Sequence, residues 1–195
     1  MQDSTLRPAT KADSQAIAAL FLISSDGLAA YIWSRLAGPD EDLIAVGARR
    51  YAREDVAFSY QNCLIAERGG EVAGMLHSFP MEHTPDAPPE ADPVLRPYSE
   101  LEDPGSLYVS GVALFPQHRG HGIGTRLMAA AVARARDLGL PRVSLICFEQ
   151  NAAAMRLYRR LGYREIARRP VVPHPTLHYA DGDAVLLARP VAASG

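Results

Sequence analysis

The stretch Gln117-His118-Arg119-Gly120-His121-Gly122-Ile123-Gly124 lies between an apolar run typical of a strand and a longer amphipathic run typical of a helix. Glycine accepts positive φ without steric cost and lets a ligand come close to the backbone. The first N–H groups of a helix have no partner within it and, with the helix dipole, they favour a bound anion. We therefore predict a phosphate-binding loop. The N–H groups expected to hold the phosphate belong to Arg119, Gly120, His121, Gly122, Ile123, Gly124 and Thr125.

Two familiar glycine-rich loops do not fit this stretch. A P-loop requires a lysine for the outer phosphates, and Lys11 is the only lysine of the chain. A dinucleotide-binding fingerprint requires Gly-x-Gly-x-x-Gly, whereas the spacing here is Gly-x-Gly-x-Gly. The ligand must therefore be another phosphate-bearing molecule.

A second motif follows, after a predicted helix and a predicted strand. It reads Asn151-Ala-Ala-Ala-Met-Arg-Leu-Tyr158-Arg-Arg-Leu-Gly162-Tyr163. Together the two motifs resemble the GNAT superfamily of acetyl-CoA-dependent N-acetyltransferases, whose patterns are Q/R-x-x-G-x-G/A and Asn-x-x-Ala-x-x-Leu-Tyr-x-x-x-Gly-Phe/Tyr. Residues 151–163 are most similar to bacterial enzymes that acetylate ribosomal-protein N-termini. The resemblance is strong over about 106–165.

The resemblance implies the fold class. We expect an α/β (α+β) protein with a mixed, mostly antiparallel, splayed central sheet flanked by helices, and one GNAT domain over residues 1–195. Expected strands cover about 6–9, 63–67, 72–78, 107–115, 143–148, 163–168 and 184–188. Expected helices cover about 13–23, 28–36, 41–54, 122–138 and 152–161. The inner face of the 122–138 helix should be formed by Ile123, Leu127, Val132, Ala135 and Leu138.

Composition fits this class. Hydrophobic residues make up 48% of the 195 residues, which is enough to form a core. No apolar run reaches the roughly 20 residues of a membrane span, and the first residues show no secretory signal. Cys63 and Cys147 both lie in apolar runs, so we expect buried free thiols. The expected location is the cytoplasm.

The charge of the chain is distributed unevenly. Eleven arginines and three acidic residues lie between Arg119 and Arg169, although the whole chain has a net charge of −2. The basic part also holds the predicted phosphate loop, which suits a polyanion such as coenzyme A. No nucleic-acid module is recognisable. The acidic remainder would suit a cationic acceptor such as an amine.

Residues from Pro80 to about Gly105 have a different composition. They hold seven of the fifteen prolines, seven acidic residues and a single base, Arg96. We expect an insertion with little regular structure. Two interpretations stay open: a mobile acidic loop, or a lid or wall over the acceptor site.

The resemblance implies roles for individual residues. The pantetheine arm of acetyl-CoA would pair with the backbone of Val112, Ala113 and Leu114, with a β-bulge at Gly111 splaying the strand. Tyr158 would protonate the departing thiolate, since a phenol with a pKa of about 10 stays protonated at neutral pH. Asn151 would contact the cofactor or simply cap its helix.

The general base is not readable from the sequence. The ribosomal-protein enzymes carry a glutamate five residues before the asparagine, and here that position is Ile146. This difference weakens the expectation of a peptide N-terminus as acceptor. The remaining candidates are Glu149, Ser110, Tyr108, His77 and Glu100.

The implied function is acetyl transfer from acetyl-CoA to a primary amine of a small molecule or peptide. No metal is expected, although His118 and His121 have the spacing of a ligand pair. The alternatives are an acyl-CoA sensor or partner module without turnover, and a transferase for another acyl group or an O-linked acceptor. Neither nucleic acid nor membrane is expected as a partner, and a homodimer is left open.

Overall fold

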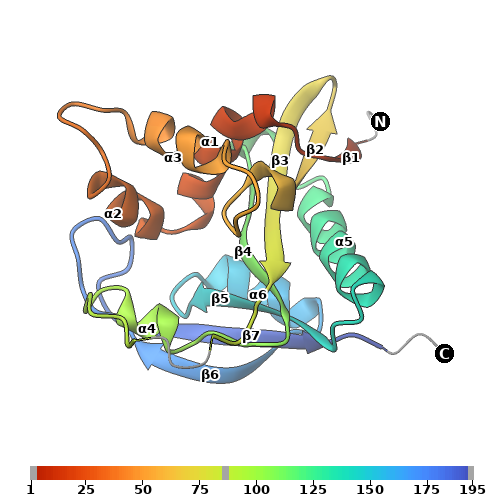
Figure 1. The fold of residues 1–195 in the computed structure, drawn as a ribbon. Coiled ribbons are helices and arrows are strands. Elements are labelled where there is room, and N and C mark those ends of the chain that lie inside the picture. The colour runs from red at the N-terminus through yellow and green to blue at the C-terminus, as the bar shows by residue number, and fades with distance from the viewer. Residues whose placement is uncertain (1–3, 85–87, 193–195) are drawn as a thin grey trace. The chain divides into compact units, whose positions relative to one another are not determined.

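The computed structural model describes residues 4–84 and 88–192, so the first three residues and residues 85–87 of the predicted insertion lie outside it. Within the described residues, seven strands form a sheet of order β1-β2-β3-β4-β5-β7-β6 (Figure 1). The strands are β1 Ser4–Pro8, β2 Cys63–Arg68, β3 Glu71–Pro80, β4 Leu107–Leu114, β5 Arg142–Phe148, β6 Arg164–Pro170 and β7 Asp183–Pro190. The α-helices are α1 Ser14–Ser24, α2 Leu28–Ser34, α3 Leu43–Tyr51, α4 Arg96–Ser99, α5 Ile123–Asp137 and α6 Ala152–Arg160. Single 3-10 turns are η1 Lys11–Asp13, η2 Tyr60–Asn62 and η3 Pro116–His118.

This order of elements confirms the predicted fold class, with two local corrections. Helix α3 ends at Tyr51 rather than near Glu54. Leu138 is 50% exposed rather than buried with the inner face of α5. The helix ends one residue earlier, and Gly139 turns the chain at a φ of 68°, so Leu138 lies past the last turn that faces the core.

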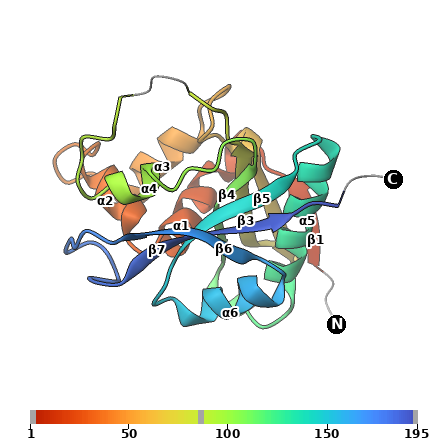
Figure 2. The same cartoon turned by 90° about the horizontal axis from the view of Figure 1, so that it is seen from below.

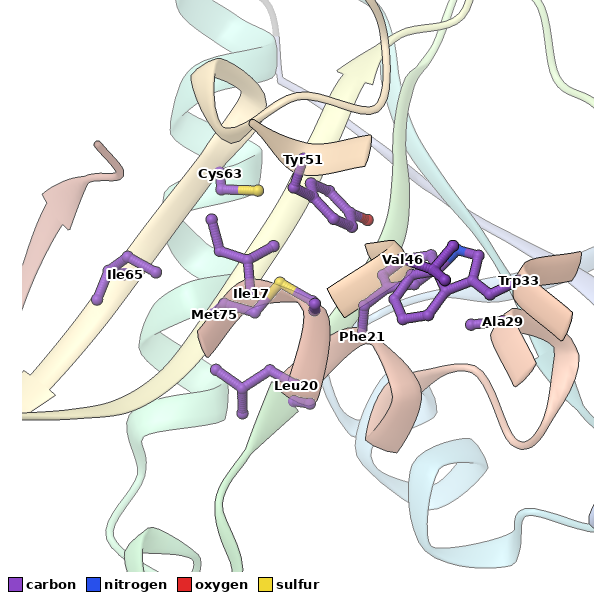
Figure 3. Packing of buried hydrophobic residues seen from close by; sticks show 12 residues of the cluster. Ile17, Leu20, Phe21, Ala29, Trp33, Val46, Tyr51, Cys63, Ile65 and Met75 are labelled. Atoms are coloured by element: carbon purple, nitrogen blue, oxygen red, sulfur yellow. The ribbon is translucent and has the colours of Figure 1, made fainter. Parts of the chain in front are cut away.

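The chain forms two compact units. The first contains residues up to Ser78 together with Gly111–Ala130. Its core joins side chains of α1, α2 and α3 to those of β2 and β3, including Ile17, Phe21, Trp33 and Met75 (Figure 3). The amphipathic helices form because their apolar residues recur at helical spacing and are buried together.

The turn between β2 and β3 shows why the predicted hairpin forms. Arg68 pairs with Glu71 across a loop of two residues, and Gly69 and Gly70 have φ of 65° and 82°. Two consecutive positive φ values belong to the type I′ turn, which matches the twist of the strands it connects.

The second unit contains Phe79–Ser110 and the chain from Ala131 onward. Its strands β5, β7 and β6 run side by side and antiparallel, with α6 next to β5 (Figure 2). Strand β5 pairs with β7 along all seven of its residues. It pairs with β4, in parallel, only from Leu107↔Val143 to Val109↔Leu145. The last three residues of β5, from Ile146 to Phe148, are paired with β7.

The described residues of the insertion have little regular structure, as expected, since their one helix is a single turn. This helix is α4 at Arg96–Ser99, and Leu101 is fully buried. Its two ends meet at its base, where the Met81 N–H donates to Ser106 O at 2.9 Å and the Gly105 N–H donates to Met81 O at 2.8 Å. The segment thus leaves and re-enters the sheet through adjacent residues.

No helix within residues 4–84 and 88–192 is long and apolar enough to cross a membrane. Cys63 and Cys147 are both buried and neither forms a disulfide, as predicted.

Candidate functional site

The predicted phosphate loop follows β4 and η3 in the first unit, and its backbone is open to the surroundings. Gly120 and Gly122 have φ of 79° and 76°, and no heavy atom lies within 4 Å of a Cβ placed on either residue. A side chain would therefore be strained by the backbone conformation and not by neighbours. The space above both glycines is available for a ligand.

The N–H groups of this loop supply its chemistry. Of the seven predicted donors, the Arg119 N–H already donates to Pro116 O at 3.2 Å. The other six, from Gly120 to Thr125, have no protein acceptor within the described part of the chain, and the first bond into α5 joins the Arg126 N–H to Gly122 O. Six neighbouring donors at the start of a fifteen-residue helix can hold an anion through hydrogen bonds and the helix dipole.

The two histidines of the loop differ in exposure. His118 is 7% exposed, and neither of its ring nitrogens has a protein partner among the described residues. His121 is exposed, and its Nδ1 lies 3.4 Å from His118 O. Across residues 4–84 and 88–192, no three histidine, cysteine or acidic side chains are grouped as a metal site would require.

The strand that precedes the loop alternates in burial. Ala113 is 6% exposed and packs in the core of the first unit, whereas Val112 and Leu114 are half-buried on the other face. Leu114 O accepts a hydrogen bond from Arg119 Nε at 3.2 Å, which ties the end of β4 to the loop.

Gly111 has a packing role that its sequence context does not reveal. A Cβ at this position would lie 2.7 Å from Ser24 Oγ and 2.9 Å from Phe21. Helix α1 therefore comes against β4 where only glycine fits. This contact accounts for Gly111 without the bulge predicted there.

In the second unit, α6 carries the residues of the second motif. Tyr158 is 9% exposed and its ring makes an edge contact with Tyr163, with 5.9 Å between centroids. Asn151 caps the helix, since its Oδ1 accepts from the Ala154 N–H at 3.2 Å. Of the two roles left open for Asn151, the cap is the one this hydrogen bond describes.

Two of the candidate bases lie in environments that do not suit proton abstraction. His77 is fully buried, and its Nε2 lies 2.9 Å from Ala57 O, so this nitrogen carries the proton and donates. Burial, with a smaller contribution from Glu102, raises the pKa of Tyr108 well above its ordinary value. A phenol that stays protonated is a poor base.

The carboxylate candidates are engaged in ion pairs. Glu100 accepts from Arg169 Nε at 2.7 Å. Glu149 lies 3.5 Å from Arg168 and accepts from the Asp183 N–H at 3.2 Å. Ser110 is half-buried on β4, and Ile146, in the position of the expected glutamate, is half-buried on β5.

The structure also gathers residues that sequence reasoning did not select. The rings of Tyr98, Phe148 and Tyr179 form a chain, with centroids 6.0 Å apart for the first pair and 5.4 Å for the second. They lie on α4, at the end of β5 and in the segment between β6 and β7. The amino-acid sequence has no periodic pattern that links positions so far apart.

Comparisons with known proteins agree with this arrangement. Residues 29–163 match the model of the Acetyltransferase (GNAT) family. A mycothiol acetyltransferase from Parafrankia sp. (strain EAN1pec) is 36% identical over 105 residues, which are 53% of this chain and 31% of that protein. One from Cellulomonas flavigena is 30% identical over 131 residues, 66% of this chain and 34% of that protein. The chain thus covers about a third of the length of these relatives.

Solved structures share the fold at low identity. A protein described as an acetyltransferase aligns with a TM-score of 0.67 at 22% identity, covering 96% of this chain and all of that one. A putative acetyltransferase from Salmonella typhimurium with its cofactor acetyl-CoA aligns at 0.61 and 21%, over 99% and 96% of the two chains. The ribosomal-protein-S18-alanine N-acetyltransferase from Escherichia coli aligns at 0.58 and 16%, over 99% and 97%. With the family model matching more than half of its residues, the chain belongs to the GNAT acetyltransferase family.

Proposed function

We propose that this chain transfers an acetyl group from acetyl-CoA to a primary amine by direct attack. The observation that carries the proposal is the run of six N–H groups from Gly120 to Thr125 that have no protein acceptor among the described residues. The pyrophosphate of coenzyme A supplies the charge and the oxygens that such donors favour. Acetyl-CoA is a substrate here.

The reaction forms an N–C bond and an S–H bond and breaks a C–S bond and an N–H bond. This chain would assist the formation of the N–C and S–H bonds. The amine nitrogen attacks the thioester carbonyl, and the tetrahedral intermediate then releases the thiolate as the C–S bond breaks. Tyr158 would give its hydroxyl proton to the thiolate, and backbone N–H groups of β4 would stabilise the oxyanion. The attacking nitrogen loses its proton to water or to a base.

The names of the sequence relatives suggest one acceptor to test. Both are called mycothiol acetyltransferases, so the deacetylated form of mycothiol belongs in a screen beside polyamines, amino acids, peptides and aminoglycosides. We further propose a cytoplasmic location, which two buried thiols that form no disulfide support.

A binding module without turnover is the second candidate. It is favoured by the state of the proposed bases, since His77 is buried and both Glu100 and Glu149 are ion-paired. The transferase proposal does not require a protein base, because an amine that arrives unprotonated, or a water that relays its proton, would make one unnecessary.

Calorimetric titration with acetyl-CoA and with free CoA tests the proposal first, followed by thiol release in the presence of each amine. Binding with amine-dependent release supports the transferase. Binding without release for any amine supports the sensor. If neither acetyl-CoA nor free CoA binds, the assignment of the phosphate loop is overturned.

A further inference from the structure

The end of α6 has the hydrogen bonds of a Schellman cap. The Tyr163 N–H donates to Tyr158 O at 3.0 Å. The Gly162 N–H donates to Arg159 O, also at 3.0 Å, and Gly162 has a φ of 85°. In such a cap, the residue after the glycine commonly makes an apolar contact with the third residue from the helix end. Here those two residues are Tyr163 and Tyr158, both in the second unit.

The side chains of the two tyrosines are in contact as well as their backbones. Their ring centroids lie 5.9 Å apart with the ring planes at 64°, an edge contact that suits the charge distribution of two aromatic rings. Tyr158 is 9% exposed and Tyr163 is 1% exposed. The cap therefore holds the Tyr158 carbonyl, and a fully enclosed neighbour holds the Tyr158 ring.

The Tyr163 ring is held by packing and not by its hydroxyl. That hydroxyl is buried and has no partner within residues 4–84 and 88–192. Burial raises the pKa of Tyr163 above its ordinary value, and the nearby Arg189 opposes this rise only in part. The ring therefore stays neutral at physiological pH, and it adds no charge that would alter how readily Tyr158 gives up a proton.

A proton donor must lie within hydrogen-bond reach of the departing atom, and a misplacement of about 1 Å can cost roughly 10²-fold in rate. The hydroxyl of Tyr158 is at the far end of its ring, so a small tilt of the ring moves it. We propose that Tyr163 is a positioning residue that fixes the ring orientation of Tyr158 through the cap of α6. The proposal rests on the proposed function, in which Tyr158 gives its proton to the thiolate. Tyr163 itself exchanges no proton.

NMR of protein whose tyrosines carry carbon-13 at Cζ tests the ring orientation without any turnover. The chain has eight tyrosines, and the resonance lost in Tyr158→Phe identifies that of Tyr158. We expect one narrow Tyr158 resonance in the wild type and in Tyr163→Phe, which keeps the ring. Tyr163→Leu should broaden or split it, because the ring then takes more than one orientation. A single narrow Tyr158 resonance in Tyr163→Leu would overturn the proposal.

Gly162→Ala changes the cap and leaves both rings in place. Gly139→Ala is the matched control, because α5 ends in the same pattern: the Leu140 N–H donates to Ala135 O at 2.8 Å, and Gly139 has a φ of 68°. Urea unfolding should show a similar loss of stability in both variants, since alanine is strained at positive φ. Only Gly162→Ala should broaden the Tyr158 resonance. Equal line widths in the two variants would contradict the role of the cap.

Steady-state rates separate positioning from a general loss of structure. Tyr163→Leu should lower kcat about tenfold or more and leave the KM for acetyl-CoA unchanged, with Tyr163→Phe close to the wild type. In protein that already has Tyr158→Phe, Tyr163→Leu should have little further effect, because the hydroxyl that it positions is gone. An equal loss in both backgrounds would overturn the proposal. A wild type that releases no thiol with any amine would instead refute the proposed function, and the NMR result would still decide the role of Tyr163.

Discussion

The indole ring of Trp33 occupies the space that a side chain at Gly47 would need. A Cβ built on Gly47 would lie 2.3 Å from the ring and 2.8 Å from the Cβ of Ala18. Helices α1, α2 and α3 meet at this point, and Trp33 is 2% exposed. The absence of a side chain at Gly47 therefore determines how closely the three helices pack.

Gly47→Ala should destabilise the protein by about 1–3 kcal/mol, because an overpacked core must shift a ring that is already enclosed. Urea unfolding measures this loss. Gly38→Ala is the control, since the nearest atom to its added Cβ is 3.8 Å away and stability should hardly change. Equal stabilities of the two variants would mean that Trp33 can move aside at no cost.

Gly122→Ala should weaken acetyl-CoA binding at least about tenfold, because a strained loop loses charge-assisted hydrogen bonds to the pyrophosphate. Calorimetry measures the affinity. Gly139→Ala is a matched control: its φ is 68° and its Cβ also meets no atom within 4 Å. Both variants should lose about 1–2 kcal/mol of stability to positive φ. If Gly139→Ala weakens binding as much, the loop has no special part in it.

Tyr158→Phe should lower acetyl transfer about 10²-fold or more while leaving the affinity for acetyl-CoA unchanged, since only the proton for the leaving thiolate is removed. Steady-state rates and calorimetry give the two numbers. Tyr163→Phe removes the hydroxyl of the neighbouring ring, and it should retain most activity. A normal rate in Tyr158→Phe would exclude this tyrosine as the acid.

Asp13→Asn should reduce stability at neutral pH, and the reduction should disappear in acid. The hydrogen bond from Arg7 is the main reason that the pKa of Asp13 falls to about 2, whereas the carboxyl titrates near 3.9 in an unfolded chain. The folded state thus takes up the proton of Asp13 at a lower pH than the unfolded chain does. The stabilisation by the Asp13 carboxylate is therefore present above about pH 4 and is lost as the pH falls toward about 2.

Unfolding in urea at pH 7 and at pH 3 measures this difference between wild type and Asp13→Asn. Glu71→Gln replaces an exposed carboxylate that has no ion pair among the described residues, and it should show no such dependence. A gap between wild type and Asp13→Asn that stays constant with pH would contradict the role of the Arg7 contact.

Local patterns in the sequence predicted most of the fold. Periodicity and turn residues located the strands and the five longer helices, and the pair Gly69-Gly70 located a hairpin. The open backbone with positive φ at Gly120 and Gly122 was predictable because glycine spacing and a helix start are both local. Phosphate binding by this loop stays a prediction. The bond of the Arg119 N–H to Pro116 O could not be foreseen, since it depends on the turn formed by η3.

What could not be predicted depends on contacts between distant residues. Gly111 and Gly47 need no special backbone conformation. Each must be a glycine because a neighbouring helix leaves no room for a side chain. Tyr98 and Tyr179 are brought together by Phe148, more than thirty positions from Tyr179. Helix α4 is a single turn, and its composition, rich in proline and acidic residues, favours a loop.

The way in which the insertion meets the sheet has a consequence for the history of such a protein. The two ends of the insertion are joined by the hydrogen bonds between Met81 and the pair Gly105 and Ser106. The length of the segment between these ends therefore does not affect the sheet. Residues between these ends can be gained, lost or exchanged while β3 and β4 keep their places. A segment attached in this way can be exchanged without rebuilding the strands that carry it.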